Sequence, residues 1–372
     1  MHVGELHHSI GEMTRLKYLS LSSSALTTLP DSIGKLKFLL ELDLDGTGIT
    51  ELPHSIGDLK MLTKMSLVMA PMKRLPNSIG GLESLIELNL EDTHIIELPA
   101  CIGNLKRLEV LHLSGTALRV LPKTIGMLEN LKRLEASCCQ NLEGEIPSEI
   151  GGLCCLRTLN LSWSNIRRLP ATMNQLSHLQ QLHLVGCHGL EQIPELPVSL
   201  KELEFPPHLL WTAPDLSYLT TLVNLHITEK TPQLLEFIRG FPKIEWIEEL
   251  SSLERLEVIM RDVTFPPINL ATLSRLRVLK ITCVEPRSLM GLPSSLEELC
   301  LFDVKWLMER SLFSNLTNLS SLELRNCRLR EVEFDDVLGQ QLVKLHGLGV
   351  RDSELIERLS MPTLKGLQRL IV

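Results

Sequence analysis

The sequence has few aromatic residues and no long apolar run, and both absences restrict its fold. Trp, Tyr and Phe make up 4% of the 372 residues, although 44% are hydrophobic. This composition suits a narrow core of aliphatic layers better than one built on packed rings. No apolar run approaches the ~18 residues of a membrane span, and the N-terminus has no basic and apolar signal regions. We therefore expect no membrane association.

The sequence also lacks an excess of positive charge. Its formal net charge is −8, and its pI is about 5.9. Proteins that bind nucleic acid by neutralising phosphates carry a basic stripe, and none is present. Tracts suited to an anionic membrane surface are missing as well. Nucleic acid is therefore not an expected partner.

Sequence motifs of catalysis and cofactor binding are absent too. There is no G-x-x-x-x-G-K-[ST], no G-x-S-x-G and no H-E-x-x-H. The nine cysteines include two adjacent pairs, Cys138-Cys139 and Cys154-Cys155, rather than C-x-x-C. This pattern favours buried, reduced thiols in a cytosolic protein over a zinc site or a disulfide framework. We therefore predict no enzyme activity, no cofactor and no metal.

A repeated stretch organises the chain. Leu85–Leu105 follows the pattern L-x-x-L-x-L, then a small-residue turn, then Leu-Pro and Ile-Gly. A fixed period of this kind is the signature of a leucine-rich-repeat solenoid. We predict an α/β solenoid, a right-handed horseshoe with a parallel sheet on its concave face and short helical turns and loops on its convex face. The first leucines of the early units, 23 residues apart, are Leu16, Leu39, Leu62, Leu85, Leu108 and Leu131.

Each part of the template predicts one local structure. The alternating leucines indicate a short strand, and Leu-Pro turns the chain because proline cannot extend a strand. We expect a helical turn next, begun by Ser or Asp and ended by Gly at a positive φ. Small residues in the strand-end turn can bond buried backbone groups, except for Ala70. These turn residues are Ser24, Thr47, Ala70, Thr93, Thr116, Cys139, Ser164 and Cys187.

Regularity divides the chain into three parts. Residues 1–194 hold the regular repeats, 195–252 are irregular repeats with an insertion, and 253–372 are irregular repeats that end without a cap. The chain begins inside a repeat, which suggests a fragment of a longer protein. Sixteen units are expected in all. The insertion, with Phe237, Phe241 and Trp246, is expected to bulge from the convex side or rim.

The residues between the leucines are the candidate partner-binding positions, because a rigid strand face is the surface that solenoids use. The early part of this face is acidic, and the late part is more basic, with Arg277, Lys280, Arg325 and Arg351. The alternative is that these side chains are only solvated, and that Trp163 packs over a neighbouring turn. A charge reversal at Asp43 and Asp45 is expected to change binding and not stability. The candidate residues are Asp43, Asp45, Asn89, Glu91, His112, Asn160, Trp163, His183 and Glu204.

Some motifs are more specific than the 23-residue template. They are Leu44-Asp-Gly-Thr47, Leu184-Val-Gly-Cys187 and Leu292-Pro-Ser-Ser-Leu-Glu-Glu-Leu299. With them, the chain resembles the repeat region of plant intracellular nucleotide-binding immune receptors of the Toll/interleukin-receptor type. The resemblance implies a cytoplasmic and also nuclear disease resistance protein, whose repeats sense a pathogen effector or a host signalling protein. It also implies autoinhibition through the nucleotide-binding domain of the same receptor, which this sequence lacks.

Other interpretations stay open. The 23-residue template is shared with intracellular Ras-group repeat proteins, so a signalling scaffold unrelated to immunity is the main alternative. Gly144–Gly151 is typical of extracellular receptors, although no signal peptide accompanies it. A repeat-fused ubiquitin ligase needs a separate catalytic domain, and no non-repeat region is long enough to hold one.

Overall fold

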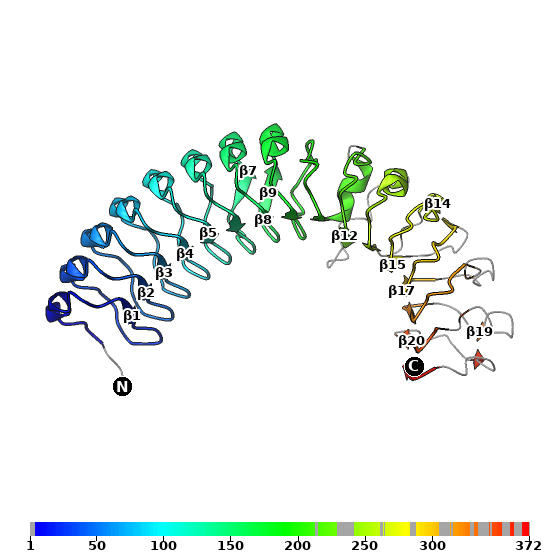
Figure 1. The fold of residues 1–372 in the computed structure, drawn as a ribbon, viewed down its shortest axis with the longest axis horizontal. Coiled ribbons are helices and arrows are strands. Elements are labelled where there is room, and N and C mark those ends of the chain that lie inside the picture. The colour runs from blue at the N-terminus through cyan, green and yellow to red at the C-terminus, as the bar shows by residue number, and fades with distance from the viewer. Residues whose placement is uncertain are drawn as a thin grey trace. The chain divides into compact units, whose positions relative to one another are not determined.

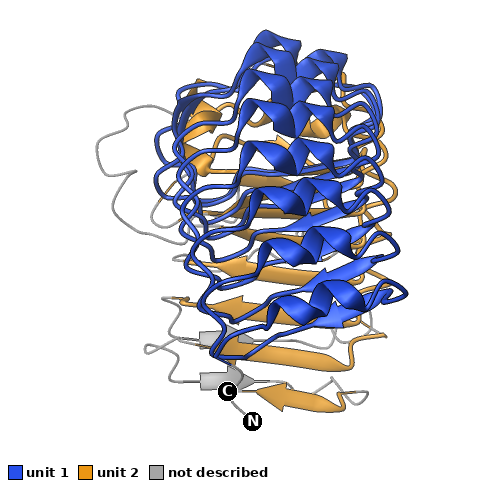
Figure 2. Cartoon of the chain, turned by 90° about the vertical axis from the view of Figure 1, so that its left-hand side faces the viewer, with its two compact units in different colours: residues 1–199 blue, residues 200–372 orange. Residues whose placement is uncertain are grey.

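The computed structural model describes most of the chain and divides it into two compact units, unit 1 of residues 1–199 and unit 2 of residues 200–372 (Figure 2). The described residues are 4–212, 215–228, 242–260, 263, 265–282, 288–304, 313, 315–327, 331–333, 342, 344–351, 358–360 and 367–371.

Parallel strands, one from each repeat, form the main sheet of each unit. Within the described residues they number sixteen, which confirms the predicted number of repeats. Those of unit 1 are β1 (Tyr18–Ser20), β2 (Glu41–Asp43), β3 (Lys64–Ser66), β4 (Glu87–Asn89), β5 (Val110–His112), β6 (Arg133–Glu135), β8 (Thr158–Asn160) and β10 (Gln181–His183). Those of unit 2 are β11 (Glu202–Phe205), β12 (Asn224–Thr228), β13 (Arg255–Ile259), β15 (Val278–Thr282), β17 (Glu298–Phe302), β18 (Ser321–Arg325), β20 (Gly347–Arg351) and β22 (Arg369–Ile371).

Short 3₁₀ helices lie on the side of the repeats opposite the strands (Figure 1). In unit 1 they stack one upon another (Figure 2). Those of unit 1 are η1 (His8–Glu12), η2 (Asp31–Lys35), η3 (His54–Asp58), η4 (Asn77–Gly81), η5 (Ala100–Asn104), η6 (Lys123–Met127), η7 (Ser148–Gly152) and η8 (Ala171–Gln175). Unit 2 adds η9 (Pro207–Trp211) and η10 (Glu245–Glu249).

The core is the stack of aliphatic side chains between strands and helices. The template leucines and the helix isoleucines are almost completely buried, as Leu88 and Ile79 show with 0% exposure each. The isoleucines therefore fill the helix side of the core, as the sequence predicts. No helix among the described residues is long and apolar enough to span a membrane.

The helix ends differ from the sequence prediction. The residue that caps η2, η3 and η4 is the proline of Leu-Pro, in an extended conformation with ψ near 150°, and no side chain bonds the helix start. Proline suits this place because its fixed φ directs the chain into the turn. The predicted capping by Ser or Asp is wrong, since Asp31 already lies inside η2.

The glycine of Ile-Gly has a different role from the predicted one. It lies inside the 3₁₀ helix, as Gly57 does in η3, and it is not among the residues with positive φ. A Cβ on Gly57 would lie 2.3 Å from the carbonyl oxygen of Ser78 in the next repeat. Glycine is therefore needed for close stacking of neighbouring helices, not for a left-handed helix end.

The small residues of the strand-end turns mostly bond as predicted. The Thr47 and Thr93 hydroxyls each donate to the carbonyl three residues earlier, at 2.7 Å. Cys139 donates its thiol to the Leu113 carbonyl at 3.1 Å. The Ser24 hydroxyl is the exception, since it is buried without a hydrogen-bond partner. In most of these repeats, a side chain thus donates a hydrogen bond to a backbone carbonyl oxygen of the turn region.

Ala70 offers a direct test of these turn bonds. Ala70→Thr should place a hydroxyl beside the Leu67 carbonyl, as Thr47 and Thr93 do in the flanking repeats. We expect a gain of about 1 kcal/mol in the free energy of unfolding, measured as a higher urea midpoint. The isosteric Ala70→Val variant is the control. Equal midpoints for the Thr and Val variants would contradict the hydrogen-bond role.

Two segments that depart from the repeat template contain regular secondary structure. The lengthened turn after β6 forms β7 (Glu143–Glu145), which pairs with β9 (Asn165–Arg168) in a small second sheet. Trp246, which was expected to bulge outward, is instead 7% exposed inside η10. Phe237 and Phe241 lie outside the described residues.

Unit 2 also has two pairs of short strands outside its main sheet. The first pair is β14 (Ile268–Asn269) with β16 (Leu289–Met290), and the second is β19 (Glu331–Glu333) with β21 (Arg358–Ser360).

The cysteines only partly follow their predicted state. No disulfide joins the eight cysteines that the structure describes. Cys139 and Cys187 are buried, and burial raises the pKa of both thiols. Cys138 and Cys154 are exposed, so the prediction of buried thiols is wrong for these two. Cys283 lies outside the described residues.

Candidate functional site

The predicted binding residues lie in the strands or in the turns directly after them. The outward-pointing side chains of the strands are here called the strand face. In unit 1, the last residue of each strand, which follows the buried middle residue, belongs to one unbroken column, here called the central column. Asn89 pairs with His112 on the next strand, and Asn160 pairs with His183. Period-2 alternation and constant repeat length place these polar groups side by side. The column is Ser20, Asp43, Ser66, Asn89, His112, Glu135, Asn160 and His183.

Several of these residues also shape the end of their own strand. Asp43, Asn89 and Asn160 each accept a hydrogen bond from the backbone N–H two residues later, at 3.0–3.1 Å. Such bonds are typical of Asx turns and direct the chain out of the strand. His112 at the end of β5 is half-buried, and so is Glu91 in the turn after β4. The face therefore combines turn-forming residues with side chains that point to solvent.

Asp45 links two repeats, which revises the expected effect of its reversal. Its Oδ1 accepts from the Ser66 hydroxyl at 2.6 Å and from the Val68 N–H at 2.8 Å. A lysine there would leave both partly buried donors without an acceptor, at a cost of roughly 1–3 kcal/mol. We therefore expect reversal at Asp45 to lower stability as well, unlike the expectation from the sequence alone. Glu91 is a better position for probing the face by charge reversal.

Trp163 packs over the turn of the following repeat. A Cβ on Gly186 would lie 2.5 Å from the Trp163 ring carbons, so the ring rests directly on that glycine. The ring also meets His188 edge-on, with centroids 6.1 Å apart. The structure therefore agrees with the interpretation in which Trp163 packs over a neighbouring turn. Its predicted role in partner binding stays a prediction.

In unit 2, Glu204 occupies the central column of β11, in register with His226 on β12. The same column continues through Glu257 and Lys280, as the sequence predicts. It then passes through Cys300, Glu323 and Gly349. Six of the predicted residues thus share this column, although they are split between the two units. Asp45, Glu91 and Trp163 lie instead in the turns that follow β2, β4 and β8.

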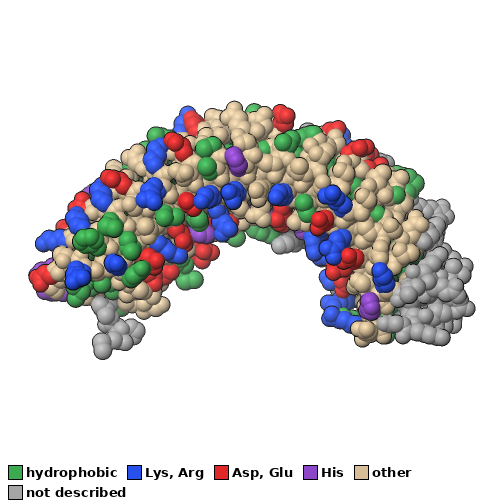
Figure 3. All heavy atoms as spheres, viewed as in Figure 1, with side chains coloured by type: hydrophobic (Ala, Val, Ile, Leu, Met, Phe, Trp, Pro, Cys, Tyr) green, Lys and Arg blue, Asp and Glu red, His purple; other side chains and the backbone are tan. Residues whose placement is uncertain are grey.

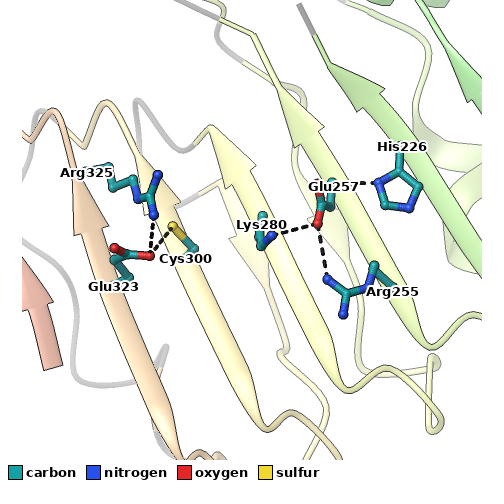
Figure 4. A network of polar contacts seen from close by, with 7 residues as sticks. All are labelled: His226, Arg255, Glu257, Lys280, Cys300, Glu323 and Arg325. Carbon is teal, nitrogen blue, oxygen red and sulfur yellow. Dashed lines mark hydrogen bonds and ion pairs between the residues drawn. The ribbon is translucent and has the colours of Figure 1, made fainter. Parts of the chain in front are cut away.

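The first charged cluster of unit 2 is centred on Glu257 (Figure 4). The carboxylate contacts Lys280 Nζ at 2.8 Å, Arg255 at 3.3 Å and His226 Nδ1 at 3.4 Å. The Glu257 side chain is 14% exposed. The hydrogen bond from His226 and the contact with Lys280 lower the pKa of Glu257 to about 2, although burial opposes this shift.

A second cluster surrounds Glu323. Its Oε2 accepts from Arg325 at 2.9 Å, and its Oε1 accepts from the Arg351 Nε at 2.9 Å. Arg325 also lies over the Phe302 ring, 5.7 Å from the centroid. Burial and the Glu323 charge raise the pKa of the Cys300 thiol to about 12, so this cysteine is a poor nucleophile at neutral pH.

Stability should depend on pH through Glu257. Because the pKa of Glu257 falls from 4.5 to about 2 on folding, its contribution is present above pH 4.5 and disappears between about pH 4.5 and 2. A shift of this size corresponds to about 3 kcal/mol, which solvent screening of the part-exposed partners reduces to about 1–2 kcal/mol. Urea midpoints of the wild type and of Glu257→Gln should differ at pH 7 and converge near pH 2. A constant difference would contradict this role.

Unit 2 also has a polar groove of about 580 Å³ where the chain enters β13, β15, β17 and β18. Arg277 donates two hydrogen bonds of 2.9 Å to Glu297 beside it. This pairing raises the pKa of Arg277 and lowers that of Glu297. None of its lining residues has a hydrophobic or aromatic side chain of the kind that is typical of small-molecule sites. Its lining residues are Glu254, Ser274, Arg275, Arg277, Ser295, Glu297, Asn318, Ser320 and Lys344.

Comparisons with known proteins agree with this geometry. Residues 4–90 match a family model described as leucine-rich repeat region. The chain has a leucine-rich-repeat fold. No curated protein sequence matches it.

Solved leucine-rich-repeat structures resemble the chain in fold. A TDR receptor has a TM-score of 0.61 and 20% identity, over 99% of this chain and 74% of the receptor. The ectodomain of the plant receptor kinase GASSHO1/SCHENGEN3 from Arabidopsis thaliana has a TM-score of 0.59 and 21% identity, over 94% of this chain. The chain spans 46% of that ectodomain. InlJ from Listeria monocytogenes has a TM-score of 0.58 and 18% identity, over 93% of this chain and 65% of that one.

Sequence reasoning missed the most connected part of the leucine-rich-repeat strand face. The site prediction stops at Glu204, whereas Glu257, Glu323 and their cationic neighbours form the two clusters of unit 2 (Figure 4). The sequence did contain a signal for these residues. Leu256, Leu279 and Leu322 occupy the same position of the repeat template, and the charged residues of the column directly follow them. The column itself was predicted as far as Lys280, but the grouping of cations around Glu257 and Glu323 was not.

Proposed function

We propose that the strand face is a protein-recognition surface and that the chain is a binding module rather than a catalyst. The observation that carries this proposal is the unbroken register of polar central residues in unit 1, from Ser20 to His183. A rigid row of varied polar groups suits a macromolecular partner, because many groups contact it at once without reordering. The groove of unit 2 lacks the hydrophobic and aromatic side chains that usually line a site for a small substrate.

The more specific proposal is that the module belongs to a plant disease resistance protein and senses an effector or a host signalling protein. Its support is the set of turn and link motifs in the sequence, above all Leu292–Leu299. On this proposal, the repeats also contact the nucleotide-binding domain of the same receptor, and the protein acts in the cytoplasm and nucleus. The intracellular Ras-group-type scaffold is the second candidate, favoured by the 23-residue step of unit 1.

Affinity capture with matched histidine variants tests the recognition surface. His112→Glu changes the strand face, and His54→Glu makes the same substitution on η3 at the opposite side. We expect some proteins from source-cell extract to bind the wild type and the His54 variant but not the His112 variant. Equal recovery by all three forms contradicts a strand-face function. Each variant is first shown to keep the wild-type urea midpoint.

Reading the transcript upstream of residue 1 separates the two specific proposals. A nucleotide-binding domain encoded in the same frame supports the immune receptor. A start codon preceded by a stop codon, with no such domain, supports the scaffold.

A further inference from the structure

Two clusters on the strand face of unit 2 have the same composition, with two cations on one carboxylate. The first triad is Arg255, Glu257 and Lys280, and the second triad is Glu323, Arg325 and Arg351. Each triad has a net charge of +1 by this composition. Figure 3 shows Lys and Arg side chains gathered with acidic ones along the inner side of this unit.

The cations of both triads are more exposed than the carboxylates between them. Glu257 and Glu323 are 14% and 23% exposed, whereas the four cationic side chains range from 35% to 42%. Each carboxylate therefore lies deeper and holds its two cations toward solvent. Arg325 and Arg351 are direct cross-strand neighbours, and Glu323, which contacts both, reduces the repulsion between them.

Two glycines of β20 lie beside the second triad. Gly347 and Gly349 occupy its first and central columns, so these two positions carry no side chain. Gly349 is buried under the Glu323 side chain, since an added Cβ would be 3.1 Å from the Glu323 Cγ. Gly347 is half-buried, and an extended segment of another protein can approach the sheet closely beside it.

We propose that the two triads bind an extended acidic segment of a protein partner, with one carboxylate group at each triad. This inference rests on the proposed recognition function and names the chemistry of the partner. Arginine suits carboxylates because its planar guanidinium can make paired hydrogen bonds. Nucleic acid is a poorer occupant, because it carries a phosphate at every nucleotide and the exposed Glu298 lies between the two triads.

The sheet geometry sets the spacing of the bound carboxylates. The midpoint of β13 and β15 lies three strand steps from that of β18 and β20, which is about 14 Å at ~4.8 Å per step. Arg325 and Arg351 also lie about 10 Å further along the strands than the cations of the first triad. The diagonal is about 17 Å, and an extended chain rises about 3.3 Å per residue, so the two carboxylates should be roughly five to six residues apart. Exposed Glu298 lies in the first column between the triads, so the intervening residues should be neutral or basic.

Fluorescence anisotropy with a synthetic peptide tests this proposal on the full chain. The probe has two Glu-Asp pairs separated by four Gly and Ser residues, and the control peptide has Gln-Asn pairs. We expect the acidic peptide to bind at least about tenfold more tightly, and to weaken from about 50 to 300 mM salt. The double variant Arg325→Gln, Arg351→Gln should lose about tenfold in affinity. Arg133→Gln on β6 of unit 1 is the matched control and should change nothing.

A further variant separates charge from structural damage. Glu323→Gln removes the internal anion and leaves both arginines, so affinity for the acidic peptide should rise about threefold or more. General damage to the site would lower it. Equal binding of both peptides, a weaker Glu323→Gln variant, or tighter binding of a poly-dT oligonucleotide of equal charge would each overturn the proposal.

The two proposals fail in distinguishable ways. The peptide experiment depends only on unit 2, whereas the capture experiment varies His112 in unit 1. If His112→Glu abolishes capture while the acidic peptide fails to bind, the recognition function stands and the acidic-segment proposal falls.

Discussion

Replacing Gly57 with alanine is expected to lower the free energy of unfolding by about 3 kcal/mol. The new Cβ would lie 2.3 Å from the Ser78 carbonyl oxygen and 3.1 Å from its carbonyl carbon. Both atoms belong to the backbone of η4, so no flexible side chain can move aside. The helices of neighbouring repeats would have to separate, which opens the core beneath them. Urea unfolding of the full chain, followed by circular dichroism, measures the change.

Asn174 provides the control for Gly57. It occupies the corresponding place in η8, where a side chain is already accommodated and exposed. Asn174→Ala should therefore change the free energy of unfolding by no more than about 0.5 kcal/mol. If Gly57→Ala is equally mild, close helix stacking is not the reason for glycine at this position.

Gly186→Ala is expected to have the second largest effect, a loss of about 3 kcal/mol. Two costs combine at this position. The backbone has φ of +75°, where a Cβ costs about 1–2 kcal/mol. The Cβ would also meet the Trp163 ring at 2.5 Å, and overpacking of this kind adds about 1–3 kcal/mol. The urea midpoint of the Gly186→Ala variant reports the two costs together.

Gly46→Ala separates these two costs. Gly46 has φ of +64°, but the nearest atom to its added Cβ would be 3.6 Å away, so only about 1–2 kcal/mol should be lost. In the double variant Trp163→Ala, Gly186→Ala, the steric part should vanish, which a double-mutant cycle measures. Additive losses in that cycle would show that the ring does not rest on Gly186.

The repeat period made much of the fold predictable. Leucines spaced by 23 residues predict strand positions in unit 1, and Leu42 and Leu88 lie buried in register as expected. Constant spacing also predicts which polar residues share a column. Period and alternation specify the direction of a side chain, and burial of the leucines enforces it.

Other features are contacts between neighbouring repeats, and the sequence of a single repeat does not predict them. Ile56-Gly57 resembles a helix end in sequence, yet its glycine is required by Ser78 in the next repeat. Asp45 resembles a solvated strand-face acid, yet it bonds Ser66 and Val68. Such contacts arise only after stacking, so local propensity cannot reveal them.

The charged clusters of unit 2 escaped prediction for a related reason. Arg325 and Arg351 belong to repeats of unequal length, so their cross-strand pairing follows from the realised register. Their shared partner Glu323 lies between them in space but not at a constant sequence step. The charges themselves were visible in the sequence as a basic late region, whereas their grouping around single carboxylates was not.

Chemical footprinting of a captured complex tests most directly whether recognition occurs on the strand face. Diethyl pyrocarbonate labels accessible histidines, and unit 1 has His112 at the end of β5 and His54 at the start of η3. We expect partner binding to slow labelling of His112 severalfold and to leave His54 unchanged. Protection of His54 with unchanged labelling of His112 would place the partner on the helix side and contradict the strand-face function.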